Sequence, residues 1–280
     1  MQNKQEKDKI KVGVLRGGTG KNYESSLMKG GDIIFHILKN LSDKYKTVDI
    51  FIDKNGNWHA NGLPVILADL VRKVDVVWNA VHPNISSSLK DFSIPHISNN
   101  IFSSALENNR EMLLEHMKSI GVDMPRFIIS PKNAREVFKK FSSPWIVKIN
   151  NEIRLVKTFN ELAETMKDKN DVIVEEFISG KVGSIHSLTK FRGEDIYVFP
   201  PKNFINNEKE KIIVLVKELH KHLGTKHYLK SNFVLHPKRG FFLTSINFSP
   251  DFKEGSNFYH SCELVGAKMH HIIEHFLDRA

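Results

Sequence analysis

Cysteine is almost absent from this sequence: Cys262 is the only one among 280 residues. One thiol cannot form a disulfide framework or a cysteine zinc cluster, and such low usage is typical of the reducing cytoplasm. The first residues, MQNKQEKDK, are polar and lack the apolar core of a signal peptide. No apolar run approaches the ~20 residues that span a bilayer. The sequence therefore predicts a cytoplasmic protein that does not enter a membrane.

The charge is unbalanced, with a formal net charge of +9, but it is not concentrated. The lysines are dispersed, often beside glutamate, and no arginine-rich block or aromatic–basic interleaving of the RNA-binding type occurs. A nucleic-acid binder is thus the weakest of the hypotheses considered. Hydrophobic residues make up 40% and charged residues 26% of the chain, which is ordinary for a soluble protein with a core.

The first hundred residues alternate between strand-like and helix-like patterns. Apolar runs at Ile10–Leu15, Val74–Asn79 and Ile94–Ile97 and the alternating run Thr47–Ile52 predict strands, and Ser25–Leu41 has apolar residues at helical spacing. Such alternation predicts a parallel sheet covered by helices.

The pattern changes near Ser98. One long amphipathic helix is expected over Phe102–Ile120 and a closing helix over Ser261–Leu277, with a β-hairpin over 228–247 and several strands and helices between. With 280 residues, two or three subdomains are expected. We predict three, covering residues 1–98, 99–180 and 181–280.

A glycine-rich loop, RGGTGKN, joins the first strand to the first helix. A phosphate-binding Walker loop needs a glycine five residues before the Gly-Lys pair and Ser or Thr after the lysine. Here Leu15 lies five residues before Gly20, and Asn22 follows Lys21. The dinucleotide fingerprint also lacks its third glycine. We expect Gly17–Thr19 to form a strand-to-helix turn, or to hold a carboxylate on its amides.

Several short motifs follow one another along most of the chain. They are VGVLRGG (12–18), ESSLMKG (24–30), VVWNAVH (76–82), SIPHI (93–97), WIVK (145–148), VIVEEFISG (172–180) and LTSINFSP (243–250). In their order they resemble the D-alanine–D-alanine ligase family. The resemblance implies an α/β plus α+β protein: an ATP-grasp fold behind an N-terminal parallel α/β domain.

The resemblance also implies an activity and its participants. Ligases of this kind phosphorylate a carboxylate with ATP and Mg²⁺, and an amine then attacks, which makes a D-alanine dipeptide for peptidoglycan. A homodimer is implied as well. The implied catalytic residues are Lys230, Ser256, Glu24 and His82, and the implied ATP-binding residues are Lys148, Glu175, Glu176 and Arg110.

The metal site departs from the family pattern. The family's hairpin supplies Asp, Glu and Asn, whereas this sequence has Asn232, Ser245 and Asn247, so only Asn247 and Asn232 remain as candidate ligands. Each lost carboxylate removes roughly 4 kcal/mol of attraction per cation charge at 4 Å and an effective dielectric constant of about 20. Lys230 stands where the family has an arginine, and it lacks the two-pronged guanidinium.

Other parts expected of such a ligase are missing. Residues 150–155 contain no glycine or serine to cover phosphates, Val182 stands where an acid would hold the ribose, and the lid is reduced to 200–207. We predict a divergent ligase-like protein with an eroded active site that is weak or inactive. The alternative is a non-catalytic scaffold that binds a partner or a small ligand.

The surviving polar residues also have plain structural explanations. His82 at a strand end is often a capped polar residue, Lys148 can extend from its strand to solvent, and Glu175 and Glu176 can form a solvated strand end. No HExxH motif accompanies the histidines around His271, so a metal site there is not expected.

Overall fold

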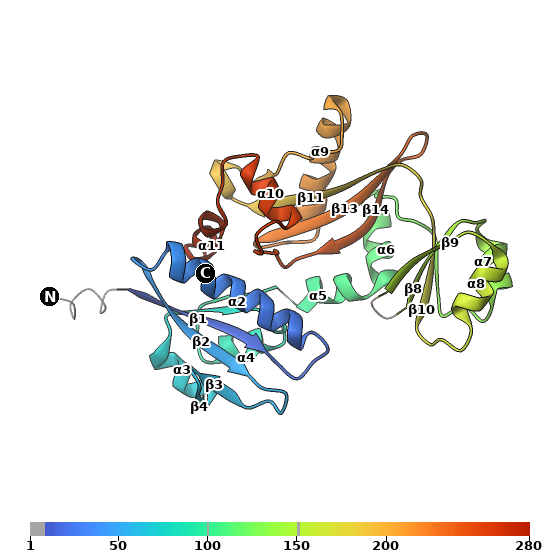
Figure 1. Cartoon of the computed structure of the whole chain (residues 1–280). Helices are drawn as coiled ribbons and strands as arrows, with labels where there is room; N and C mark the ends of the chain where they lie inside the picture. Colours follow the sequence, from blue (N-terminus) through green and yellow to red (C-terminus); the bar gives the residue numbers. More distant parts are fainter. Residues whose placement is uncertain (1–8, 100, 150–151) are drawn as a thin grey trace.

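A computed structural model describes residues 9–99, 101–149 and 152–280. Asn150 and Asn151, part of the glycine-free segment noted above, lie outside the described residues. The chain forms three β-sheets, each flanked by helices (Figure 1). No helix within these three ranges combines the length and hydropathy needed to cross a membrane.

The first sheet is mixed, with strand order β4-β3-β2-β1-β5-β6. Its central pairs, β1 with β2 and β5, are parallel, and β3 and β4 continue the edge as antiparallel strands. The strands are β1 (Ile10–Gly17), β2 (Tyr45–Ile52), β3 (Trp58–Ala60), β4 (Leu63–Val65), β5 (Val76–Asn79) and β6 (His96–Ile97), and the helices are α2 (Tyr23–Asn40), α3 (Leu67–Lys73) and α4 (Ile85–Asp91). The central strands are nearly continuous runs of buried residues, as expected for parallel strands covered on both faces.

The second and third sheets are antiparallel, with orders β7-β10-β8-β9 and β12-β11-β13-β14. The second contains β7 (Phe127–Ile129), β8 (Trp145–Ile149), β9 (Glu152–Val156) and β10 (Val172–Glu176), with α7 (Ala134–Lys140) and α8 (Phe159–Met166) beside it. The third contains β11 (Lys181–Thr189), β12 (Ile196–Val198), β13 (Tyr228–His236) and β14 (Gly240–Asn247), with α9 (Asn206–His222) against it. Figure 1 shows the second sheet, with α7 and α8, set apart at the end of the molecule.

The helix expected over Phe102–Ile120 is wrong in one respect: it is two helices, α5 (Ile101–Asn108) and α6 (Arg110–Ser119). Asn109 has extended φ and ψ angles, and its side chain accepts a hydrogen bond from the Met112 amide. Asparagine is a strong N-cap, so the chain bends here and starts a new helix. The bend sets Arg110 at the first position of α6.

The closing helix expected over Ser261–Leu277 is likewise divided, into α10 (Asn257–Glu263) and α11 (Met269–Leu277). Gly266, between them, has φ of +66°, which breaks an α-helix. The division lets α11 pack back on the first sheet, where the Phe276 ring stacks on Trp78 with centroids 5.4 Å apart. One hydrophobic core therefore joins the first sheet to the C-terminal helices.

Candidate functional site

A buried carboxylate, Glu175, lies between two cations. Glu175 on β10 is 3% exposed, and Lys148 on the adjacent strand β8 donates from Nζ to its Oε1 at 2.8 Å. Arg110 Nε lies 3.0 Å from the same oxygen, and Arg110 Nη1 donates to the Thr244 carbonyl on β14 at 2.7 Å. Three of the four residues expected to bind ATP thus form one cluster, which joins α6 to the second and third sheets.

Glu176, the fourth of these residues, makes different contacts. Arg126 Nε lies 2.9 Å from its Oε2 and Arg239 Nη1 lies 2.6 Å from its Oε1. Burial alone would raise the pKa of Glu176, but hydrogen bonds from the two guanidinium groups outweigh it and lower the pKa to about 2. Both carboxylate oxygens have partners, so this side chain fastens the second sheet to the third.

The hairpin of β13 and β14 carries a neutral hydrogen-bonded row where the ligase pattern has carboxylates. Ser184 Oγ donates to Asn232 Oδ1 at 2.6 Å, and Asn232 Nδ2 donates to Ser245 Oγ at 2.7 Å. Further along, Asn247 Nδ2 donates to Glu107 Oε1 at 2.5 Å, and Asn247 Oδ1 accepts from the Ser249 amide at 2.9 Å.

Glu107 was missed by sequence reasoning. It lies near the end of α5, and burial raises the pKa of its carboxyl group, against the lowering effects of the Phe248 amide, Lys29 and Asn247. No signal in the sequence pointed to it, because its contact with Asn247 spans 140 positions along the chain.

These residues do not fit a magnesium site. Mg²⁺ binds oxygen ligands, carboxylates above all, yet the part of the chain that the structure describes holds no group of three or more His, Cys, Asp or Glu side chains able to take a metal. The side-chain oxygens of Asn232 and Asn247 already accept hydrogen bonds. We therefore assign no step of chemistry to a metal at this hairpin.

A cavity of about 390 Å³ opens over the hairpin. Lys230, Asn232 and Asn247, all expected in the site, line it together with Lys29 from α2 and Asp251. The structure thus brings together one of the four expected catalytic residues and both expected metal ligands. Lys29 was missed, because a lone lysine on a helix is ordinarily a solvated one.

The other three expected catalytic residues lie elsewhere or have structural roles. Ser256 is the N-cap of α10: its Oγ accepts from the Tyr259 amide at 3.1 Å and donates to the Asp251 carbonyl at 2.9 Å. Glu24 is exposed in the first turn of α2. His82 is exposed after β5, and its Nδ1 accepts from the Asn84 amide at 3.2 Å.

Two backbone amides of the glycine loop already donate hydrogen bonds within the protein. Gly17 N donates to Ser26 Oγ at 3.0 Å and Gly18 N donates to the Ile52 carbonyl at 2.8 Å, and both glycines have positive φ. The segment forms a turn between β1 and α2. These two amides have no free hydrogen for a ligand.

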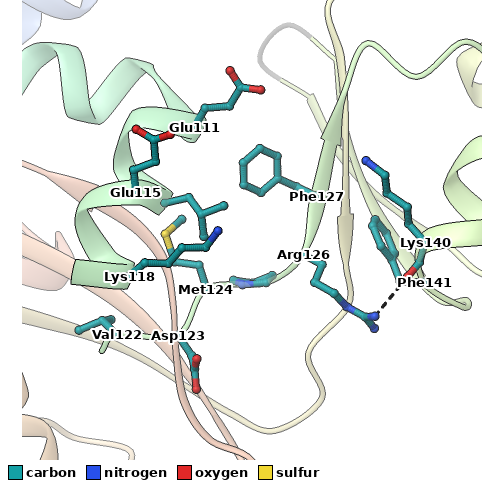
Figure 2. A pocket seen from close by; sticks show the side chains of 12 residues that line it. Glu111, Glu115, Lys118, Val122, Asp123, Met124, Arg126, Phe127, Lys140 and Phe141 are labelled. Carbon is teal, nitrogen blue, oxygen red and sulfur yellow. Dashed lines mark hydrogen bonds between the residues drawn. The ribbon is translucent and has the colours of Figure 1, made fainter. Parts of the chain in front are cut away.

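A second, larger cavity of about 820 Å³ lies between α6 and the β7–α7 region, and none of the expected site residues lines it. Figure 2 shows Glu111 and Glu115 of α6 on one side, with Phe127 between them and the Arg126 and Lys140 side. Arg126 Nη1 donates to the Lys140 carbonyl at 3.2 Å. The lining mixes apolar residues with charges of both signs, so it favours no one ligand chemistry.

Curated relatives match the chain over nearly its whole length. The D-alanine–D-alanine ligase of Carboxydothermus hydrogenoformans is 23% identical over 318 residues and the match covers 96% of this chain and 97% of that protein. The ligase of Christiangramia forsetii is 21% identical over 316 residues, covering 93% and 95%. No family model matches the sequence.

Solved structures share the fold. D-alanyl-alanine synthetase A from Vibrio cholerae superposes with a TM-score of 0.79 at 16% identity, covering 98% of this chain and 100% of that one. The D-alanine–D-alanine ligase from Bacillus anthracis in complex with ATP gives a TM-score of 0.74 at 18% identity, with 96% of each chain covered. The fold expected from the sequence, ATP-grasp behind an N-terminal α/β domain, is confirmed.

Proposed function

Because the chain is a divergent member of the D-alanine–D-alanine ligase family of ATP-grasp proteins, we propose that it keeps the ligase scaffold but is weak or inactive as a magnesium-dependent ligase. In this proposal the scaffold binds a small ligand at the β13–β14 hairpin and a nucleotide near Lys148.

One observation carries the proposal: the hydrogen bonds from Ser184 to Asn232 and from Asn232 to Ser245. Phosphoryl transfer depends on positioning and on neutralising the charge of the transferred phosphate, which a metal held by carboxylates ordinarily does. A row of neutral side chains that satisfy one another supplies no such charge. Asn247 is held by Glu107 rather than left open.

Nucleotide binding is supported by the cluster of Lys148, Glu175 and Arg110, although it is already internally paired. A triphosphate near Lys148 competes with Glu175 for the ammonium group. Binding is therefore expected to be weaker than in a site whose lysine is free, because the existing ion pair must first be broken.

The test is product formation by the unmodified protein with D-alanine, ATP and magnesium, measured as phosphate and dipeptide release. The Bacillus anthracis ligase, assayed alongside, is the positive control. We expect turnover at least a thousandfold below the control. A kcat in the ordinary range of ~1–10³ s⁻¹ would show that the chain is a working ligase.

The second candidate is a non-catalytic binding protein, which the two lysines that line the hairpin cavity, Lys29 and Lys230, favour. Calorimetric titration with ATP plus magnesium, together with the turnover assay, separates the two: slow but measurable turnover supports a weak ligase, and ligand binding with no turnover supports the second. If the chain is active, D-alanine or a similar amino acid is the proposed substrate and a peptidoglycan precursor the proposed product. A cytoplasmic location and a homodimer are proposed from the family alone, and size-exclusion chromatography tests the dimer.

A further inference from the structure

Two lysines from different parts of the chain face the hairpin cavity. Lys29 lies on α2 and Lys230 on β13, and both side chains line the same space of about 390 Å³. Across residues 9–99, 101–149 and 152–280, neither ammonium group has an ion pair or hydrogen bond, unlike Lys148 or Lys44, which pair with carboxylates. Both are partly shielded from solvent, which weakens their hydration.

The remaining lining is almost neutral. The same lining contains Asn232, Ser245 and Asn247, and its one carboxylate is Asp251. Outside the lining, Glu107 accepts a hydrogen bond from Asn247 and interacts electrostatically with Lys29. Asp251 is exposed, and it accepts a hydrogen bond from the Lys253 amide at 3.1 Å. The lining therefore carries a net positive charge. At an effective dielectric constant of about 20, each lysine raises the electrostatic energy of a unit positive charge 4 Å away by roughly 4 kcal/mol.

The lowered pKa of a buried histidine that lines the cavity also indicates positive surroundings. His186 on β11 is 2% exposed and lines the cavity floor with Tyr228 and Phe258, whose rings it contacts. Burial first, and Lys230 second, lower the pKa of His186 to about 3, so the ring is neutral at pH 7. Its Nε2 has no hydrogen-bond partner among the described residues, which marks an interaction still unfilled.

We propose that this cavity binds the anionic group of a small ligand, a carboxylate or a phosphate, directly through Lys29 and Lys230 and without a divalent cation. The inference rests on the proposed function, in which the hairpin has lost its metal site. Two ammonium groups take the place of the cation, and the amides and hydroxyls of the hairpin supply hydrogen bonds to the ligand oxygens.

The experiment is calorimetric titration with inorganic phosphate and, separately, with acetate, each in EDTA and again in excess magnesium. We expect at least one of the two anions to bind with the same Kd in both buffers. The anion that binds assigns the ligand as phosphate or carboxylate. No binding of either anion at 10 mM, or binding that needs magnesium, would overturn the proposal.

Variants identify the site. Lys29→Met and Lys230→Met should each weaken binding at least tenfold, and Lys230→Arg should retain most of it. Lys211→Met, which removes an exposed lysine of α9, is the matched control and should leave Kd unchanged. Thermal unfolding checks that the methionine variants are folded; each should be at least as stable as the parent, because an unpaired charge has been removed. Equal binding in all variants would contradict the assignment.

The two proposals fail separately. Turnover with ATP and magnesium would refute the loss of ligase activity and leave the EDTA titration to decide the anion site. Absence of anion binding would refute the anion site and leave the turnover measurement unaffected.

Discussion

Arg239, in the turn between β13 and β14, holds Glu176 at the end of β10 with Nη1 and Oε1 2.6 Å apart. The contact joins the third sheet to the second, and Arg126 binds the other oxygen. The guanidinium groups are half exposed, so each pair contributes modestly. Glu176→Gln should lower the free energy of unfolding by about 1 kcal/mol at pH 7, measured by urea denaturation.

The stability difference between the parent and Glu176→Gln should depend on pH. The pKa of Glu176 is about 2 in the folded protein and 4.5 ordinarily, so its stabilising effect is present above pH 4.5 and is lost as the pH falls toward 2. The difference between parent and Glu176→Gln should shrink over that range. Glu194→Gln, which breaks an exposed pair with Lys217, is the control and should change stability little at any pH.

Glu175 and Lys148 should respond unequally to mutation. Glu175→Gln leaves Arg110 buried without a counter-charge, and losses of this kind are about 3 kcal/mol. Lys148→Met leaves Glu175 paired with Arg110, so about 1 kcal/mol is expected. Urea denaturation measures both. Calorimetry with ATP should give the opposite order, with the larger loss of affinity in Lys148→Met. A matching order in the two measurements would contradict the proposed nucleotide contact.

The buried histidines predict sensitivity to mild acid. Burial lowers the pKa of His220 to about 4 and that of His186 to about 3. The unfolded chain binds these protons below about pH 6.5, so stability is present above that pH and falls as the pH drops toward 4. At pH 5 the loss is at most about 2 kcal/mol for each fully buried histidine.

The measurement is the urea midpoint at pH 7 and at pH 5. His227→Phe removes a third such group, whose pKa burial lowers to about 4, and keeps a ring against Phe276. It should reduce the difference between the two midpoints. His82→Gln, at an exposed position, should not. A stability that does not change between pH 7 and pH 5 would show that these rings are not held neutral.

Periodic segments were predicted well from the sequence, and interruptions were not. β5 (Val76–Asn79) lies within the run expected over Val74–Asn79, because it is a short apolar run in a covered sheet. The helix over 102–120 was expected to be continuous, because its apolar spacing continues through Asn109; only the cap geometry of that residue shows the break. Strand β9 was missed, since its residues are mostly exposed and show no alternation.

The site residues likewise divide into those that the sequence located and those that it did not. Family motifs located Lys148 and Glu175, and their contact follows from adjacent strands. Glu107, which binds Asn247, and Lys29, which lines the same cavity as Lys230, could not be found, because both lie on helices far away in the sequence. Ser256 fitted a family position but serves as a helix cap. Contacts set by tertiary packing leave no local signal.

The first glycine of the loop should be irreplaceable and the third dispensable. Gly17 has φ of +89°, and an added Cβ would lie 2.2 Å from the Ile52 carbonyl oxygen. Gly20 has nothing within 4 Å of its added Cβ and carries no positive-φ restriction. Gly17→Ala should destabilise by well over 1 kcal/mol, whereas Gly20→Ala should be neutral or slightly stabilising. Equal thermal midpoints would contradict the turn geometry.

Restoring carboxylates to the hairpin should restore magnesium affinity without turnover. In Asn232→Asp the new carboxylate can still accept from the Ser184 hydroxyl, which now binds the amide oxygen, so the fold should tolerate it. Combined with Ser245→Glu, two negative charges face a cavity lined by Lys29 and Lys230. Calorimetry should detect magnesium binding at least tenfold tighter than in the parent, a change of about 1.4 kcal/mol.

The matched control is Asn84→Asp with Ser87→Glu, which adds the same charges at exposed positions near α4 and should not bind magnesium. In the hairpin variant the anion affinity measured in EDTA should fall, because the two carboxylates repel the ligand and pair with the lysines. ATP turnover with D-alanine should stay at the parent level, since Lys148 remains paired with Glu175. If turnover instead rises into the ordinary range of ~1–10³ s⁻¹, carboxylates at positions 232 and 245 are by themselves sufficient for ligase activity, and the proposal that the rest of the site is unsuited to turnover is wrong.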